Sequence, residues 1–391
     1  MITGKRVLVI SPQAWGKMFV AKHHYAVELS RSGNEVFFLN PPGDEGFKVD
    51  EISAYPGLSV VSHKTAFPVV LRFKARWLYD MLMKRHVQQL VKQLGGGFQI
   101  VWCFELNLYS DLSWFGAPVS IYHPVDELFN EQQRRPGKKA DLIISVTKEI
   151  LQKFEGFSAT RLLVNHGISR EFREASARLE WARQAPVSVG YSGNLLRKDI
   201  DFPTLEACIL KMPEVRFIFW GNYAMKDSNL AGNENEEVRG FVEFLKNAPN
   251  VSLRGQVSMA QLAKEYEEAD MFVICYDIEK DQSKGTNYHK VIEFLSTGRV
   301  TVSNNITAYD GQDLLRMCRS RSGNEEFPGL LADTIQQLDV FNSPEKQAQR
   351  KAYATSNTYE SHLITISKMI NHDFKAKNSE PGISPGVRSK N

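Results

Sequence analysis

Residues 284–305, KGTNYHKVIEFLSTGRVTVSNN, place one carboxylate, Glu293, in an apolar helix that follows a polar loop. The backbone N–H groups of residues 285–290 would bind an anion such as phosphate, because a helix start carries free donors and the positive end of the dipole. Lys284 or Lys290 would add a point charge, and Glu293 would accept hydrogen bonds from ribose hydroxyls. These residues indicate a nucleoside diphosphate site; the alternative is that Glu293 only favours the helix start.

Three further segments follow predicted strands and carry glycine, asparagine, tyrosine or cations: SGNLLRK at 192–198, WGN at 220–222 and YD at 276–277. Each alone also fits a solvated turn, since short glycine motifs often occur by chance. Their convergence is stronger evidence, because ligands of doubly wound sheets bind outside the carboxyl ends of strands. The expected donor-site residues are Gly193, Asn194, Arg197, Lys198, Gly221, Asn222, Tyr276, Lys284, Gly285, Thr286, Asn287, Lys290 and Glu293.

The elements that must position these loops are predicted by continuous apolar runs separated by helical spacing, which is typical of parallel sheets covered on both faces. In the first half we expect strands at 6–10, 35–39, 58–62, 98–104, 119–122, 141–146 and 161–164. In the second half we expect strands at 187–191, 215–220, 251–253, 271–275 and 299–302. Helices are expected at 19–32, 71–94, 169–184, 203–211, 259–269, 289–296 and 345–373.

Composition narrows the class of protein. The chain has 391 residues, enough for two domains, with 42% hydrophobic and 24% charged residues, which is ordinary for a soluble globular protein. A net charge of +3 does not by itself imply nucleic acid. The four cysteines are far apart and indicate buried thiols in a reducing compartment. The N-terminal apolar run lacks a cleavage site, and no apolar stretch has the length of a membrane span, so a cytoplasmic location is expected.

Several of these segments resemble GT-B glycosyltransferases, most closely glycosyltransferase family 4. NYHKVIEFLSTGRVTVSNN is similar to that family's Lys-x-x-Glu-(Tyr/Phe)-Leu-(Ala/Ser)-x-Gly-x-x-Val segment, and this match is the most specific. YSGNLLRKDIDFPTL resembles the first strand of its second domain and the Gly-Arg/Asn-Leu…Lys loop, and YATSNTYESHLITISKMI resembles its last helix. The sequence departs from the family pattern where Gly285 takes the position of a first glutamate that often faces the donor sugar, and where Asn194 replaces a common arginine.

The resemblance implies a GT-B α/β fold, in which two Rossmann-like domains face a central cleft and a C-terminal helix crosses back. It implies an N-terminal acceptor domain at 1–168 with a returning helix at about 354–373, a linker at 169–186 and a donor domain at 187–353. The polar composition of 375–391, with glycine and proline, predicts a disordered tail there. The implied activity is transfer of a sugar from a UDP- or GDP-linked donor to a saccharide or lipid-linked acceptor, usually with retention, in surface or exported polysaccharide synthesis. The missing glutamate keeps open the alternative of an inactive nucleotide- or partner-binding protein. A nucleotide-sugar epimerase of the same fold is a further alternative.

Acceptor-side and catalytic candidates lie in the first half. His123 and Asp126, in IYHPVDELFN, are catalytic candidates: either would be the general base of an inverting reaction, whereas a retaining reaction needs no base and they would position substrates. The alternative for Asp126 is to begin a helix. Trp15 and Lys17 would meet the acceptor. No spacing of ligands predicts a metal site, so neither a metal nor another cofactor is expected.

The predicted helix at 71–94 combines six cations with apolar residues that include Phe73 and Trp77. Basic amphipathic helices can lie on anionic membranes, which would suit a lipid-linked acceptor at the inner face of the membrane. The alternative is a helix packed on the first domain with a solvated basic face. Nucleic acid is not among the expected partners.

Overall fold

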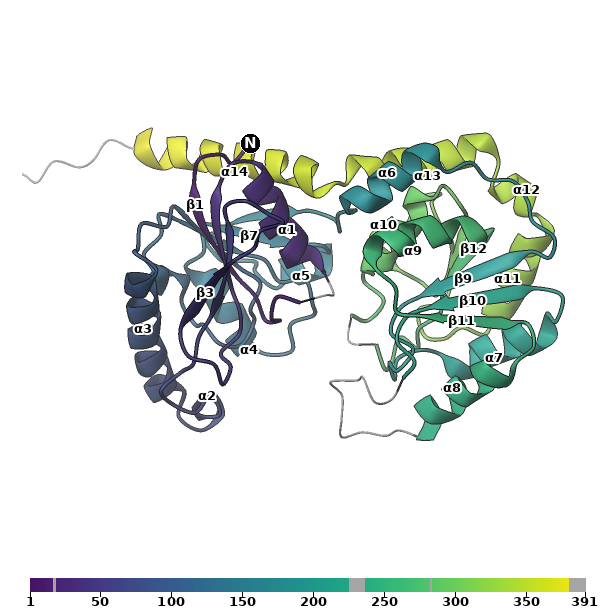
Figure 1. Ribbon diagram of the computed structural model, residues 1–391, viewed down its shortest axis with the longest axis horizontal. Coiled ribbons are helices and arrows are strands. Elements are labelled where there is room, and N and C mark those ends of the chain that lie inside the picture. Colours follow the sequence, from purple (N-terminus) through teal and green to yellow (C-terminus); the bar gives the residue numbers. More distant parts are fainter. Residues whose placement is uncertain (17–18, 225–235, 282, 380–391) are drawn as a thin grey trace, which may run out of the picture.

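The computed structural model describes residues 1–16, 19–224, 236–281 and 283–379. Its first sheet has eight strands, in the order β3-β4-β2-β1-β5-β6-β7-β8, and all neighbours are parallel except β3 and β4 (Figure 1). These strands are β1 (Arg6–Ile10), β2 (Glu35–Leu39), β3 (Lys48–Glu51), β4 (Leu58–Ser62), β5 (Ile100–Cys103), β6 (Val119–Tyr122), β7 (Leu142–Ser145) and β8 (Thr160–Leu163).

The second sheet has six parallel strands in the order β11-β10-β9-β12-β13-β14. The strands are β9 (Ser188–Ser192), β10 (Arg216–Trp220), β11 (Val251–Gly255), β12 (Met271–Ile274), β13 (Thr301–Ser303) and β14 (Arg316–Met317). This is the Rossmann strand order, with its switch point between β9 and β12. The loops after these two strands are therefore where a ligand is expected to bind.

Helices cover both sheets, and apolar side chains fill the layers between them. The first domain carries α1 (Ala21–Arg31), α2 (Leu71–Lys74), α3 (Arg76–Gln93), α4 (Glu131–Arg134) and α5 (Lys148–Gln152). The second carries α6 (Arg170–Arg178), α7 (Phe202–Lys211), α8 (Glu236–Asn247), α9 (Met259–Glu265), α10 (His289–Ser296), α11 (Phe327–Gln336), α12 (Leu338–Phe341) and α13 (Pro344–Ser356).

The last helix, α14 (Tyr359–Ser379), returns to the first domain and runs along α1 (Figure 1). Tyr359, Leu363 and Ile366 pack into that domain's core, and the Tyr25 hydroxyl lies 3.0 Å from Nδ1 of His362. α14 therefore fixes the first domain to the end of the second.

Two expected long helices are broken in the structure. The helix predicted at 71–94 is interrupted at Ala75, whose φ of -147° and ψ of 71° leave the helical region, so α2 ends at Lys74 and α3 begins at Arg76. The helix predicted at 345–373 is interrupted between α13 and α14. α14 also continues to Ser379, so the tail predicted from 375 begins within a helix, and residues 380–391 lie outside the described part of the chain.

Within the predicted linker 169–186, α6 packs into the core of the second domain through Phe172 and Ala175. Two short strands, β3 and β14, were not expected from the sequence. Among the described residues, no helix has the length and apolar character needed to cross a membrane.

Candidate functional site

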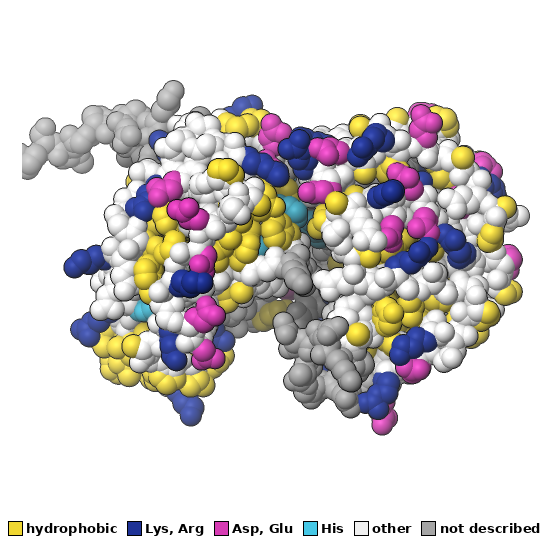
Figure 2. Space-filling view, in the orientation of Figure 1, with side chains coloured by type: hydrophobic (Ala, Val, Ile, Leu, Met, Phe, Trp, Pro, Cys, Tyr) yellow, Lys and Arg dark blue, Asp and Glu magenta, His cyan; other side chains and the backbone are white. Residues whose placement is uncertain are grey.

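A cavity of about 1010 Å³ lies between the two domains. Figure 2 shows the hollow between the two halves of the molecule, with histidine side chains visible at its upper end. Both domains supply its walls: the segments after β1 and β6 on one side, and the loops after β9, β10, β11 and β12 with the start of α10 on the other. The predicted site residues that line it are Asp126, Gly193, Asn194, Arg197, Gly221, Asn222, Tyr276, Asn287, Lys290 and Glu293.

The loops after β9, β10 and β11 pack backbone against backbone. The Gly193 N–H donates to the Trp220 carbonyl at 2.9 Å, and the Gly221 N–H donates to the Gly255 carbonyl at 2.8 Å. A Cβ atom on Gly221 would lie 1.7 Å from the Gly193 carbonyl oxygen, and its φ of 139° favours glycine. Glycine is therefore required at Gly221, and it leaves the backbone of the adjacent loop open to a ligand.

Arg197 is one of the cations that line the cavity from this wall. Its guanidinium donates to both Asp199 carboxylate oxygens and lies 5.0 Å above the Tyr276 ring. The hydrogen bond with Asp199 raises the pKa of Arg197. Asp199 therefore fixes the guanidinium in place while the side chain remains 41% exposed. Lys198, its predicted companion, is exposed outside the cavity wall.

Glu293 sits on α10 with its side chain 1% exposed, at the floor of the cavity. Lys290 Nζ lies 2.9 Å from one carboxylate oxygen, and His289 Nδ1 lies 3.2 Å from the other. Burial would raise the pKa of Glu293, but the charge of Lys290 and the hydrogen bond with His289 lower it to about 2. The Tyr266 hydroxyl also donates to the oxygen beside Lys290, at 3.5 Å. Each carboxylate oxygen accepts up to two hydrogen bonds, so the oxygen beside His289 retains capacity for a ligand hydroxyl.

The loop before α10 is organised by Asp281, a residue that the sequence analysis missed. Its carboxylate accepts from the Gly285 N–H at 2.9 Å and from the Tyr288 hydroxyl at 2.7 Å. This bracing holds Lys284 at a φ of 52°, in the left-handed region that few side chains adopt. Asp281 also lines the cavity. The sequence did contain a signal for its role: in an Asp-x-Ser pattern the aspartate side chain commonly accepts a hydrogen bond from the backbone two residues later, as Asp281 does from the Ser283 N–H.

The structure places the other predicted members of this loop outside the cavity wall. The Lys284 ammonium donates to the Glu279 carbonyl at 2.8 Å, and the Thr286 hydroxyl donates to the Ser283 carbonyl at 2.8 Å. Gly285 lies against the Asn305 carbonyl, where a Cβ atom would approach it to 2.8 Å. These three residues therefore stabilise the conformation of the loop and do not line the cavity.

Asn287 links the donor loop to the first domain. Its side-chain amide donates to the Val146 carbonyl at 3.0 Å and to Oδ1 of Asn165 at 2.8 Å. Its own side-chain oxygen is buried without a partner among the described residues. Asn287 therefore connects the two walls of the cavity and keeps one acceptor available.

The catalytic and acceptor-binding candidates of the first domain do not meet at one place in the cavity wall. The His123 ring is 1% exposed and accepts a hydrogen bond from the Trp102 indole at 3.2 Å, and burial lowers its pKa to about 3. His123 therefore belongs to the core beside the cavity, whereas Asp126 lines it. Trp15 packs against Phe38 at 4.9 Å and is not in the wall. Lys17 lies outside the described residues.

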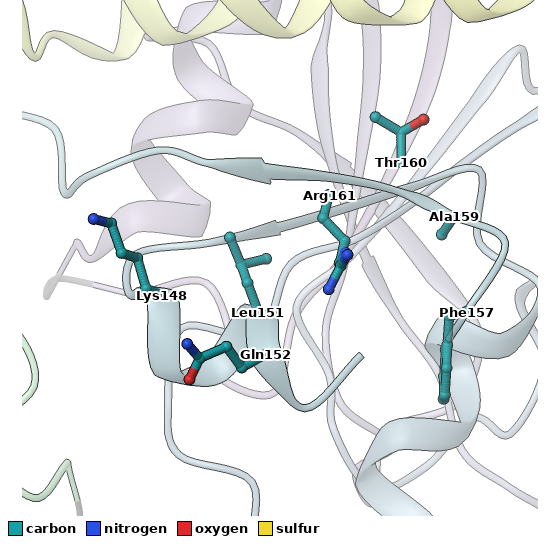
Figure 3. A pocket seen from close by; sticks show the side chains of 7 residues that line it. All are labelled: Lys148, Leu151, Gln152, Phe157, Ala159, Thr160 and Arg161. Atoms are coloured by element: carbon teal, nitrogen blue, oxygen red, sulfur yellow. The ribbon is translucent and has the colours of Figure 1, made fainter. Parts of the chain in front are cut away.

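A second hollow, of about 560 Å³, lies beside α5 and β8 in the first domain (Figure 3). Figure 3 shows Lys148 and Gln152 at one end, Phe157 at the other, and Leu151 and Arg161 between them. None of the predicted site residues lines this hollow, and only one domain contributes to it. The interdomain cavity is therefore the candidate site. Among the described residues, no group of three or more His, Cys, Asp or Glu is arranged to hold a metal ion.

Two facing parallel-sheet domains, a cavity between them and a C-terminal helix that returns to the first domain define the GT-B fold, so the predicted fold class is confirmed. Solved GT-B glycosyltransferases superpose over nearly the whole chain. Sucrose-phosphate synthase from Thermosynechococcus elongatus has a TM-score of 0.65 at 12% identity, and the alignment covers 95% of this chain and 100% of that one. The E. coli trehalose-6-phosphate structure bound with UDP-2-fluoro glucose has a TM-score of 0.67 at 13% identity, covering 93% and 98%.

Anabaena HepE, solved in complex with UDP and glucose, has a TM-score of 0.61 at 13% identity, and the alignment covers 95% of this chain and all of HepE. Identities at this level show a shared fold and nothing finer. No protein-family model and no curated protein matches the sequence. The resemblance to glycosyltransferase family 4 therefore stays a prediction.

Proposed function

We propose that this protein is a glycosyltransferase that moves a sugar from a UDP- or GDP-linked donor to a saccharide or lipid-linked acceptor in polysaccharide synthesis. The observation that carries the proposal is the second-domain wall of the cavity, where Arg197, Glu293 and the backbone around Gly193 and Gly221 converge. This set offers a cation for diphosphate, an acceptor for ribose and open backbone for close approach. The UDP named in the titles of two structural neighbours supports the same class of donor.

In the proposed reaction, the bond between the anomeric carbon and the diphosphate oxygen breaks, and the diphosphate keeps the electron pair. The acceptor hydroxyl oxygen forms the new bond to that carbon, and its proton passes to the oxygen of the leaving diphosphate. Arg197 stabilises the charge that develops on the leaving diphosphate. We propose retention of configuration, in which no protein base is required and Asp126 positions the acceptor. The proposal includes no metal ion, since cationic side chains carry this role.

Binding and turnover test this function directly. A thermal-shift titration with UDP and GDP should stabilise the full chain, by about 2.7 kcal/mol at a hundredfold excess over Kd. Incubation with UDP- and GDP-sugars should then release the nucleoside diphosphate, at least by slow hydrolysis. Stabilisation without any turnover would instead indicate an inactive binding protein, and a changed sugar still linked to its nucleotide would indicate an epimerase.

We also propose that α2 and the start of α3 contact an anionic membrane surface. Phe73 and Trp77 are 75% and 74% exposed, and Val70 is 54% exposed beside them. Phe73 lies on α2 and Trp77 in the first turn of α3, and apolar side chains gather over α2 in Figure 2. The surrounding exposed cations are Lys74, Lys84 and Arg85. Exposed aromatic side chains flanked by lysine and arginine fit the interface of a bilayer that contains anionic lipids.

Flotation with liposomes tests this contact. The full chain should float with vesicles that contain anionic lipid and less with neutral vesicles, and added salt should weaken the binding by screening. Phe73→Ser combined with Trp77→Ser should reduce the bound fraction several-fold, because it removes buried apolar area worth about 1.5–3 kcal/mol per side chain. Leu210→Ser is the matched control, since Leu210 is 68% exposed on α7 of the other domain. Equal binding to both kinds of vesicle would contradict the proposal.

A further inference from the structure

One buried cation of the cavity wall takes no part in the proposed donor site. Lys22 lies in the first turn of α1, its side chain is only 6% exposed, and it lines the cavity. None of the residues that the structure describes lies within hydrogen-bond or ion-pair distance of its ammonium group. A buried charge without a partner is costly for folding, which points to a ligand as the missing partner.

The electrostatic surroundings keep Lys22 available as a cation. Burial lowers its pKa to about 8, and the charges of Asp126 and Glu105 oppose this effect. Glu105 is itself occupied, because its carboxylate accepts from the backbone N–H groups of Asn107 at 2.6 Å and Leu108 at 3.2 Å. Asp126 is exposed on the loop after β6. Lys22 is therefore mostly protonated at pH 7 without being neutralised by a direct ion pair.

The N-terminus of α1 adds positive potential at the same place. Its N-cap residue is Val20, which has no side-chain oxygen for the N–H groups of the first turn, and that turn contains no acidic residue. Val20 and Ala21 line the cavity together with Lys22. Free N–H groups and the helix dipole favour an anion, and the lysine supplies a full charge beside them.

We propose that Lys22 and the first turn of α1 bind an anionic group, a phosphate or a carboxylate, on the acceptor substrate. This rests on the proposed glycosyl transfer, in which Arg197 of the other domain holds the donor diphosphate. The anion at Lys22 is then a second one, carried by the molecule that occupies the first-domain wall. Asp126, which lines the same cavity and whose charge acts on Lys22, would lie beside the same acceptor.

The test uses the full chain with UDP at saturation, so that the donor phosphate site is filled, and inorganic phosphate as the probe at constant ionic strength. Phosphate binding is followed by phosphorus NMR line broadening, and acetate in competition covers the carboxylate case. Lys22→Gln should weaken phosphate binding about tenfold, because it removes a charge-assisted contact. Lys92→Gln, an exposed lysine of α3, should change it less than about twofold.

The outcomes separate this inference from the proposed function. Lys22→Gln should melt at or above the wild-type temperature, because it removes a buried charge that has no partner. Unchanged phosphate affinity in this folded variant, with UDP still bound, overturns the acceptor anion site and leaves the donor site standing. Equal losses of UDP and phosphate affinity also overturn it, because Lys22 would then hold the donor. If the wild type binds no UDP, the proposed function fails, and the phosphate titration alone decides the role of Lys22.

Discussion

Glu293→Gln should lower the affinity for a nucleoside diphosphate ten- to a hundredfold while the protein stays folded. Glutamine keeps the size of the side chain and one acceptor oxygen, but it removes the charge that strengthens a hydrogen bond from ribose. Such a charge-assisted contact contributes about 1.5–3 kcal/mol, which corresponds to that loss of affinity. Calorimetric titration of the wild type and the variant with UDP, with far-UV circular dichroism as the check on folding, measures the effect.

The affinities of the variants for uridine and for UDP distinguish a contact with the ribose from a contact with the phosphates. Glu293→Gln should weaken uridine and UDP alike, since both contain the ribose. Arg197→Ala should weaken UDP more than uridine, since its guanidinium is assigned to the diphosphate. Unchanged UDP affinity in folded Glu293→Gln would mean that the carboxylate only organises α10 by pairing Lys290 and His289, and that the donor site lies elsewhere.

The lowered pKa of Glu293 sets the pH range in which its ion pairs stabilise the fold. Its pKa is about 2 in the folded protein, below the ordinary value of 4.5. The unfolded chain therefore binds the proton first as the pH falls, and the contribution of Glu293 is fully present above about pH 4.5 and is lost as the pH falls through about 2. At pH 7 the glutamine variant should consequently be less stable than the wild type whether or not Glu293 binds ribose, so affinity and not stability decides its role.

Much of the fold was accessible from the sequence, because continuous apolar runs mark buried parallel strands. The strands at 6–10, 35–39, 58–62 and 119–122 have the bounds that the pattern predicted. β3 was not accessible, because KVDE is a charged edge strand with no apolar pattern. The break at Ala75 was not accessible either, since no glycine or proline marks it in the sequence.

The sequence predicted the parts of the site that depend on the order of the strands. It did not predict the parts that depend on the orientation of individual side chains. The loops after β9, β10 and β12 reach the cavity because strand ends meet at one edge of a sheet. His123 also follows a strand, yet its ring turns into the core toward the Trp102 indole, which no local pattern indicates. Lys22 did have a signal: it shares the helical stripe of Tyr25, Ala26 and Leu29, all buried, and a lysine on such a stripe is unusual.

Of the variants considered, Gly221→Ala should lose the most folding stability. The added Cβ would lie 1.7 Å from the Gly193 carbonyl oxygen, and alanine rarely adopts a φ of 139°. Backbone strain of about 1–3 kcal/mol and overpacking of about 1–3 kcal/mol together give a loss of roughly 3 kcal/mol or more. For a domain of this size the Tm should fall by roughly 6–12 °C, since each kcal/mol shifts it by about 2–4 °C.

Gly240→Ala is the matched control, because a Cβ at this exposed position of α8 meets nothing within 4 Å. Alanine is the better helix former by about 0.5–1 kcal/mol, so this variant should melt at or slightly above the wild-type temperature. The two variants add the same methyl group to the same domain, and only one adds it between the loops after β9 and β10. The difference between their Tm values, measured by differential scanning calorimetry, therefore reports the effect of the close approach of Gly221 and Gly193.

Gly221→Ala should also abolish UDP binding, because displacement of the loop after β10 breaks the bonds from Gly193 to Trp220 and from Gly221 to Gly255. These bonds align the backbone at the wall where the diphosphate is placed. Measurement of UDP affinity well below the lowered Tm separates this displacement from global unfolding. A Gly221→Ala protein that melts like the wild type and binds UDP equally well would show that the two loops do not pack backbone against backbone. The donor site would then be formed by other residues.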